Sequence, residues 1–296
     1  MTARDDSASG QGVCPGDERG AGVARRELLA DGACGKLAAR LYKPQQADDD
    51  TLIVCFPPGG FVEDELEAID MFLRALAADT RCRVLASAYT LAQERPFPAA
   101  VEDAYAVLKW AKRQRMRLGW SGRHMISAGI EAGGNLAAVS ALMARDRGGP
   151  PLAAQLLIMP MLDPNLSTGS MRKMSTDNGV VRAVELCVSA YRGYLPRAID
   201  RAHPYASPLQ SSRMSGLPPA LILSADDDPL RDEAEQYGTK LISAGIKTLV
   251  KRLPPIALDE PDARCSCARQ EDALREIRHF IHGLQAEARK TSDLQK

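Results

Sequence analysis

The chain has 296 residues, and its 38 lysines and arginines balance 38 aspartates and glutamates, so the formal net charge at pH 7 is zero. Hydrophobic residues make up 45% and charged residues 26%, which is the composition of an ordinary globular protein. A balanced charge gives no general attraction to nucleic acid or to an anionic membrane. No apolar run approaches the ~18 residues that span a bilayer. We therefore expect neither a nucleic-acid nor a membrane partner.

The first 24 residues contain no apolar stretch and are rich in Gly, Asp and Ser. We expect them to form a flexible arm, neither a signal peptide nor a transit peptide, and we expect a cytoplasmic protein. The seven cysteines are scattered and are then expected to be reduced thiols. Cys265 and Cys267 form a C-x-C pair, but no second pair stands nearby to complete four metal ligands. We expect no metal and no organic cofactor.

Strand and helix patterns alternate from about residue 36 onward. Short β-rich runs predict strands over residues 36–43, 51–56, 83–88, 124–128, 153–160, 219–225 and 247–253. Apolar residues at helical spacing predict helices over residues 66–76, 98–111, 135–145, 180–195, 228–245 and 271–285. This alternation predicts an α/β protein with a mostly parallel, doubly wound sheet and helices on both faces. Functional sites of such sheets lie at the carboxyl ends of the strands.

Residues 164–208 interrupt this alternation because they contain no buried-strand run but do contain the amphipathic stretch 180–195. A long insertion between core strands is typical of a cap over a functional site. We therefore expect a single domain over residues 25–289, with a helical cap at about 164–208 and a tail at 290–296.

The most informative segment is the strand–turn–helix at 125–135. Gly129 and Gly133 stand two positions before and two positions after Glu131. Small residues at this spacing are typical of a nucleophile elbow, in which a strained side chain projects over the sheet. The central residue, however, is a glutamate where hydrolysis would require a serine.

On these residues the chain resembles the hormone-sensitive-lipase-like (acetyl esterase) branch of the α/β hydrolases, over roughly residues 36–285. The family pattern GDSAGGN is similar to residues 129–135, HGGGF to residues 57–61, and DYxLAPE with the following FPxA to residues 88–94 and 97–100. Three further motifs, SPL, LPPALI and DPLRDE, appear at residues 207–209, 217–222 and 228–233. The resemblance implies the α/β-hydrolase fold and is compatible with a homodimer.

The resemblance also implies where a catalytic triad would stand. It places the acid at Asp228, the nucleophile at Glu131 and the histidine near Leu258, so two of the three family residues are replaced. A relocated histidine at His203 is the weaker alternative, and the remaining histidines are His124, His279 and His282. We therefore expect this chain to be inactive as a serine esterase.

The oxyanion hole survives better than the triad. The resemblance places its amide donors at Gly59, Gly60 and Ala132, all of them small residues. Pro57 and Pro58 stiffen the loop that leads to them and remove one donor. These amides are able to stabilise an enolate or a carboxylate instead of a tetrahedral ester intermediate.

Three functions remain open for Glu131. As a general acid/base it would make the chain a lyase, isomerase, cyclase or decarboxylase acting on a small organic metabolite, with Asp228 as its modulator. Burial near Leu258 and repulsion by Asp228 would raise its pKa, while the amides would lower it, so the net direction stays open. Alternatively Glu131 fills a retired oxyanion hole, and the chain is a pseudo-hydrolase that binds a small ligand or a protein partner. The third function is hydrolysis by an unrecognised arrangement.

Overall fold

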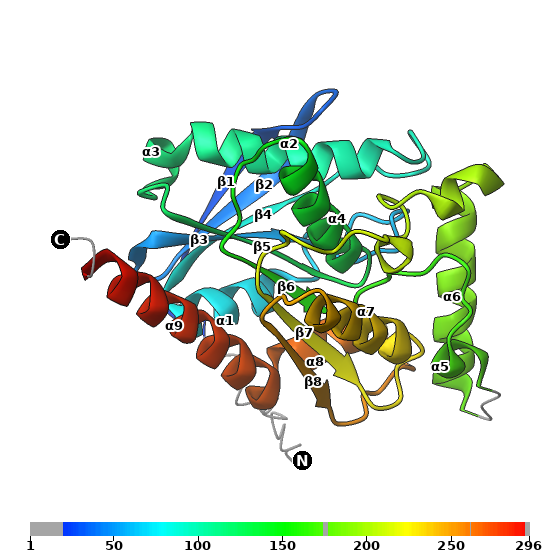
Figure 1. Ribbon diagram of the computed structural model, residues 1–296. Coiled ribbons are helices and arrows are strands. Elements are labelled where there is room, and N and C mark those ends of the chain that lie inside the picture. The colour runs from blue at the N-terminus through cyan, green and yellow to red at the C-terminus, as the bar shows by residue number, and fades with distance from the viewer. Residues whose placement is uncertain (1–19, 174–176, 261, 294–296) are drawn as a thin grey trace, which may run out of the picture.

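The computed structural model describes residues 20–173, 177–260 and 262–293, and one eight-stranded sheet runs through them (Figure 1). The order of the strands is β1-β2-β4-β3-β5-β6-β7-β8. Their bounds are β1 Ala24–Asp31, β2 Lys36–Lys43, β3 Asp48–Phe56, β4 Cys82–Ser87, β5 His124–Ile130, β6 Ala154–Ile158, β7 Ala220–Ala225 and β8 Thr248–Leu253.

The sheet is parallel from β4 through β8, and β1 and β2 extend it as antiparallel strands. Strands β4, β6 and β7 are buried along their whole length. Continuous burial is expected of the mostly apolar runs in these strands, because helices cover both faces of a parallel sheet. The predicted fold class, a mostly parallel doubly wound sheet, is confirmed.

Two layers of helices cover the sheet (Figure 1). Helices α1, α8 and α9 share one apolar core with the sheet, and α2, α4 and α7 share the other. Their bounds are α1 Asp70–Thr80, α2 Ala99–Arg113, α4 Ala132–Asp146, α7 Arg231–Ser243, α8 Ala263–Arg269 and α9 Glu271–Asp293, and the short α3 spans Arg115–Leu118. No helix in the described ranges combines the length and the apolarity needed to cross a membrane.

Strand β1 and helix α8 are among the elements that were not predicted from the sequence. Strand β1 is an edge strand whose residues are mostly exposed, so it carries little apolar signal. Helix α8 is a short helix of seven residues that contains two cysteines, and its apolar residues show no clear helical spacing.

The ends of the chain also differ from the prediction. Ala24, placed in the arm, already belongs to β1, and α9 continues past residue 290 to Asp293. Residues 1–19 and 294–296 lie outside the described residues.

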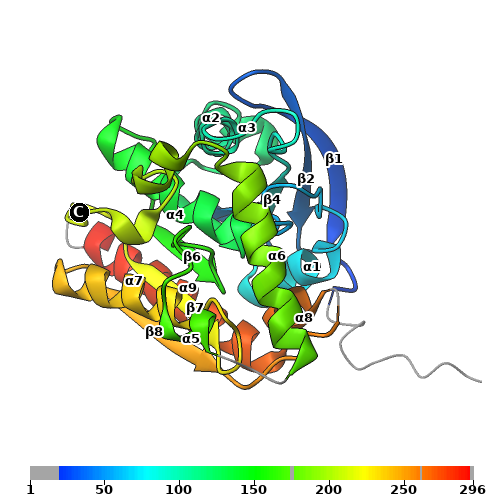
Figure 2. The ribbon, with the colours of Figure 1, turned by 90° about the vertical axis from the view of Figure 1, so that its right-hand side faces the viewer.

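The insertion at 164–208 contributes helices and, in its described part, no strand. It contains α5 (Gly169–Arg172), α6 (Asn178–Tyr194) and the 3₁₀ turn η1 (Ala198–Ala202), and a second turn, η2 (Pro208–Gln210), follows. Asp177 caps the first turn of α6 by accepting from the Gly179 amide at 2.8 Å. In Figure 2 the long helix α6 passes in front of the sheet.

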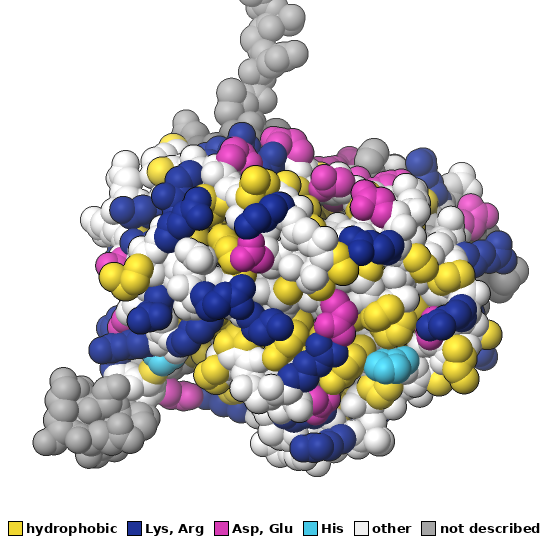
Figure 3. Space-filling model, turned by 90° about the horizontal axis from the view of Figure 1, so that it is seen from above, with side chains coloured by type: hydrophobic (Ala, Val, Ile, Leu, Met, Phe, Trp, Pro, Cys, Tyr) yellow, Lys and Arg dark blue, Asp and Glu magenta, His cyan; other side chains and the backbone are white. Residues whose placement is uncertain are grey.

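The face above α2 and α4 mixes basic, acidic and hydrophobic side chains (Figure 3). Basic side chains of α2 and of the residue after α4 are hydrogen-bonded within the chain. Arg147 donates two hydrogen bonds of 2.7 Å to Glu102, and Lys112 donates to the carbonyl of Gly122. These contacts hold the side chains of Arg147 and Lys112 in place.

A tight turn joins β5 to α4 at Glu131, whose φ of 56° and ψ of −114° are a strained combination for a residue with a side chain. Two glycines make this turn possible. A Cβ on Gly129 would lie 2.1 Å from the backbone of Gly133, and a Cβ on Gly133 would lie 2.0 Å from the carbonyl oxygen of Phe56. The turn thus has the geometry of the predicted nucleophile elbow.

We expect Gly133→Ala to destabilise the protein by about 3 kcal/mol, because its methyl group would collide with backbone atoms that cannot move aside. Gly283→Ala is the matched control. Gly283 lies on helix α9 with open space where a Cβ would stand, so alanine should stabilise by about 0.5–1 kcal/mol. Urea unfolding measures both changes, and equal effects of the two substitutions would contradict this account of the elbow.

Candidate functional site

A cavity of about 280 Å³ opens beside Glu131 at the carboxyl edge of the sheet. Its walls come from the loop after β3 between residues 58 and 68, from Glu131, from α6 between residues 182 and 190, and from residues 258–265 after β8. Segments that are far apart in the sequence therefore meet around one glutamate. The helix α6 forms one wall, so part of the insertion at 164–208 lies where a cap was expected.

Backbone hydrogen bonds fix the position of Glu131. Its amide donates to the Ile158 carbonyl at 3.0 Å, and its own carbonyl accepts from the Met161 amide at 3.0 Å, which joins the elbow to the end of β6. The side chain is partly buried and reaches the glycine loop, where Oε2 accepts from the Gly59 amide at 3.3 Å. The carboxyl group therefore lies where the family oxyanion hole was predicted.

The glycine loop is held in shape by its own turns and by Tyr89. Gly59 and Gly60 have φ values of 107° and 58°, and the Tyr89 hydroxyl donates to the Pro58 carbonyl at 2.9 Å. A Cβ on Gly60 would lie 2.8 Å from the Cβ of Ala190 on α6. The loop and the insertion are thus packed so closely that a side chain at position 60 would push them apart.

Two of the three predicted amide donors do not donate a hydrogen bond to another part of the described chain. Within the described part of the chain, the amides of Gly60 and Ala132 make no hydrogen bond, whereas the Gly59 amide donates to Glu131. Ala132 begins α4, where the first amides of a helix have no partner in the helix itself. Gly60 lines the cavity, and an oxygen atom of a ligand there is the natural acceptor for its amide, whereas Ala132 is fully buried and is not among the residues that line the cavity.

The surroundings of Asp228 differ from the sequence-based picture, in which Asp228 stood near Glu131 without a cation. The carboxyl group is fully buried and is bound by Arg264, whose Nε and Nη2 lie 2.8 and 3.0 Å from its two oxygens. The Leu230 amide donates to it as well, at 2.9 Å. Arg264 lies on α8, which was not predicted, and it lines the cavity while Asp228 does not. Asp228 therefore acts on the cavity through an arginine.

The pKa of the Glu131 carboxyl is raised above its usual value, mainly because burial penalises the charged form. The Arg264 guanidinium and the Gly59 amide work in the opposite direction, and the Asp228 and Glu63 carboxylates add to the rise. The direction that the sequence left open is thus settled by burial. The expected contribution of Asp228 is present, but the attraction by Arg264 was missed.

Leu258 lines the same cavity as Glu131, as expected for the family histidine position. No histidine within the described ranges lines this cavity. His203 lies outside it, with its ring 5.3 Å from that of Phe97 and its Nδ1 accepting from the Tyr205 amide at 3.0 Å. The relocated histidine that the sequence left as an alternative is therefore not placed beside Glu131.

The three consecutive aspartates after β7 have separate partners. Asp226 pairs with Arg252 at 3.3 Å, Asp227 accepts from the Ile256 amide at 2.9 Å, and Asp228 pairs with Arg264. The described residues contain no group of three or more side chains placed to hold a metal ion. Cys265 and Cys267 are buried free thiols on α8.

Carboxylates dominate the mouth of the cavity. Besides Glu131, five acidic side chains line it, against the two guanidinium groups of Arg182 and Arg264, and these acids are Glu63, Glu65, Asp259, Glu260 and Asp262. Glu65 is partly buried, and burial together with the neighbouring carboxylates raises its pKa. Because Asp228 compensates Arg264, the cavity repels anions.

Comparisons with known proteins agree with this fold. The family described as alpha/beta hydrolase fold matches residues 53–256. The chain is 37% identical over 225 residues to the carboxylic ester hydrolase LipN of Mycobacterium tuberculosis, a match that spans 74% of this chain but 59% of that protein. It is 32% identical to an arylesterase of Saccharolobus solfataricus over 74% of this chain and 71% of the relative. A solved esterase from Pyrobaculum calidifontis superimposes with a TM-score of 0.74 at 32% identity, covering 90% of this chain and 86% of that structure.

We expect Arg264→Leu to cost about 3–5 kcal/mol of stability, because it leaves the Asp228 carboxylate buried without its cation. The double variant Asp228→Asn/Arg264→Leu should recover much of this loss. Arg123→Leu serves as the control, since the Arg123–Asp50 pair is exposed and is worth about 0–1 kcal/mol. Urea unfolding tests all three, and a double variant no more stable than Arg264→Leu would contradict the assignment.

Glu131 should make stability depend on pH. Its raised pKa means that the folded state holds this proton more tightly than the unfolded state, so stability is lost as pH rises from about 4.5 through the folded pKa. Glu131→Gln removes this penalty and should raise the Tm at pH 8 by about 2–4 °C for each kcal/mol relieved. The difference should vanish near pH 4. A variant that is less stable than the wild type at pH 8 would show that the charged carboxylate is favoured.

Proposed function

Because the chain belongs to the α/β-hydrolase fold family, in its hormone-sensitive-lipase-like branch, we propose that it uses the nucleophile position of an esterase for proton transfer. It is an esterase-like protein in which Glu131 acts as a general acid/base on a small organic molecule. The observation that carries this proposal is a carboxyl group of raised pKa lying beside two amides that have no acceptor within the described chain.

The chemistry requires only groups that line or adjoin the cavity. Glu131 takes a proton from a carbon next to a carbonyl, and the electron pair of that bond moves onto the carbonyl oxygen. The amides of Gly60 and Ala132 donate to the oxygen as it becomes negative. Return of the proton to a different atom completes an isomerisation, and loss of a leaving group from the next carbon completes an elimination. A pKa raised towards neutrality improves proton transfer in both directions.

The lining of the cavity favours an uncharged or cationic substrate. Six carboxyl groups, including Glu131, face two guanidinium groups, and one of these two is compensated by Asp228. An anionic substrate would meet net repulsion on entry. The volume of about 280 Å³ fits a molecule of modest size.

A second candidate function is supported by the hydrogen bond from the Gly59 amide to Glu131 at 3.3 Å. In this arrangement the carboxyl group occupies part of the oxyanion hole, and the chain is a pseudo-hydrolase that binds a ligand or a partner without transforming it. The charge of Glu131 then matters little, while the shapes of the glycine loop and of α6 decide binding.

Hydrolysis remains the third candidate because the matched relatives are named as esterases and ester hydrolases. Ester cleavage here would require a nucleophile activated without a histidine beside it. Neither Arg264, which is held by Asp228, nor Leu258 is able to take a proton from an attacking hydroxyl group. This candidate is therefore supported by kinship and not by the residues of the cavity.

The decisive comparison is of metabolites in the source organism among the wild type, a deletion and Glu131→Gln. Under proton transfer we expect Glu131→Gln to accumulate the same intermediate as the deletion, because glutamine keeps the shape but accepts no proton. That intermediate then identifies the substrate. Glu185→Gln is the matched control, since it removes an exposed carboxylate of α6 that does not line the cavity and should behave as the wild type.

Two outcomes would overturn the proposal. If Glu131→Gln matches the wild type while the deletion differs, Glu131 fills the site and the protein acts by binding. If the purified protein turns over p-nitrophenyl acetate and Glu131→Ala abolishes this turnover, the chain is a hydrolase. Bulky substitutions at Gly59 should impair function under every candidate, because a Cβ there would lie 2.4 Å from the Glu63 carbonyl oxygen.

A further inference from the structure

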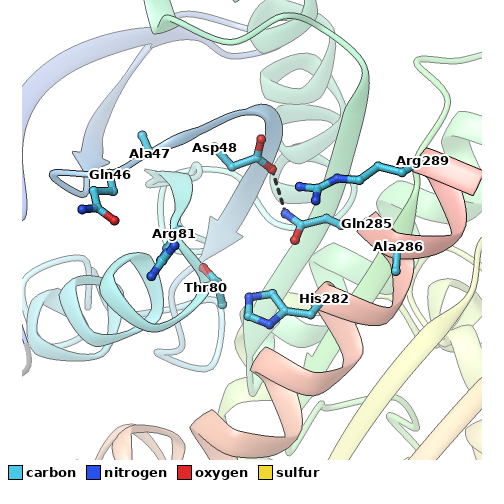
Figure 4. A pocket seen from close by; sticks show the side chains of 9 residues that line it. All are labelled: Gln46, Ala47, Asp48, Thr80, Arg81, His282, Gln285, Ala286 and Arg289. Atoms are coloured by element: carbon cyan, nitrogen blue, oxygen red, sulfur yellow. Dashed lines mark hydrogen bonds between the residues drawn. The ribbon is translucent and has the colours of Figure 1, made fainter. Parts of the chain in front are cut away.

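A second cavity, of about 450 Å³, lies at the opposite edge of the sheet (Figure 4). It is enclosed by the start of β3 at Asp48, by the turn between α1 and β4 at Thr80 and Arg81, and by the last turns of α9. Strand β3 separates it from the glycine loop, and eight residue steps along a strand span about 26 Å. This cavity is therefore independent of the site at Glu131.

Two arginines without partners reach this cavity from different elements. Arg81 belongs to the turn after α1 and Arg289 to α9, and both side chains are exposed and make no ion pair or side-chain hydrogen bond within the described ranges. In contrast, the neighbouring Arg278 is held by Asp79 at 2.7 Å. The Arg81 carbonyl accepts from the Asp48 amide at 2.7 Å, which fixes the backbone that carries the first guanidinium. The two charges are thus available to a ligand.

Asp48 is the one carboxylate among the described residues that line this cavity, and its oxygens already accept hydrogen bonds from the protein. Asp48 accepts from the Gln285 side chain at 2.7 Å (Figure 4). It also accepts from the Thr51 hydroxyl at 3.0 Å and from the Asp50 amide at 3.1 Å. These hydrogen bonds direct its oxygens towards β3 and α9. With two guanidinium groups against one engaged carboxylate, the cavity carries a net positive charge before any titration.

The surroundings of His282 on α9 agree with this net positive charge. The pKa of His282 is lowered below 6.5 by burial and by the neighbouring cations, and these are Arg278, Arg81, His279 and Arg289. The acids that face this region, Asp79 and Asp48, are engaged by Arg278 and by Gln285 respectively. Burial is the largest cause of this lowered pKa and the cations add to it, so the charge around His282 has the sign that attracts an anion. A bound anion would oppose the contribution of the cations and raise the pKa of His282.

We propose that this cavity binds the phosphate group of a small phosphate monoester. Each of two walls carries one guanidinium group, which offers charge-assisted donors to the oxygens and the negative charge of such a group. The hollow is larger than a phosphate ion requires and is of the size of small-molecule sites, so the ester carries a further organic moiety. The concave shape favours a soluble small molecule over an extended polyanion.

The test is titration of the full chain with phenyl phosphate at low ionic strength, followed by calorimetry and by NMR of the histidine ring protons. The chain has four histidines, so each signal is assignable by single substitution. We expect saturable binding with a Kd below about 1 mM, a shift of the His282 signal with a rise in its pKa, and unmoved signals of His124 and His203. Binding should weaken as salt is added.

Single substitutions test whether Arg81 and Arg289 bind the phosphate group. Arg81→Gln and Arg289→Gln should each weaken binding by about tenfold. Arg192→Gln removes the same charge from an exposed position on α6, outside both cavities, and should leave the Kd unchanged. Glu131→Gln should also leave it unchanged, which keeps this result separate from the proposed function. A Kd above about 10 mM, equal affinity for phenol, or binding that survives both arginine substitutions would overturn the proposal.

Discussion

The close approach of the first turn of α4 to the end of β3 is the constraint on which the site depends. Gly133 allows this approach because a Cβ there would overlap the Phe56 carbonyl oxygen. The approach forces the residue before the helix into a positive φ, and so lifts the side chain of Glu131 over the edge of the sheet. It also brings the first turn of α4 beside Phe56 and Pro57, where the glycine loop begins. Elbow, oxyanion amides and cavity are therefore consequences of one packing contact.

The pair of Asp228 and Arg264 is the second organising contact. A buried carboxylate needs a partner, and in this chain a guanidinium on α8 supplies it with two hydrogen bonds. The arginine also lines the cavity, so the acid of the former triad position now sets the electrostatics of the site indirectly. Burial nevertheless outweighs this cation at Glu131, and the pKa of that carboxyl stays raised. A fixed cation beside a tunable carboxyl is an arrangement suited to proton transfer.

The linings of the cavities at the two edges of the sheet carry opposite charges. Acidic side chains surround the cavity at the carboxyl edge, whereas Arg81 and Arg289 dominate the cavity at the other edge. A net charge of zero conceals this separation, because composition sums over the whole surface. The local fields, and not the overall charge, decide which ligands each cavity attracts.

Pattern and motif in the sequence determined the fold class, the central strands, the elbow and the glycine loop. These features depend on local periodicity and on residues close together in the chain, such as Gly129, Glu131 and Gly133. The tertiary structure alone decided the partner of Asp228, the direction of the pKa shift at Glu131 and the cationic cavity at Arg81. Arg264 is separated from Asp228 by 36 positions and lies on a helix without apolar period. Burial and long-range pairing arise only when distant segments meet, so no local pattern in the sequence encodes them.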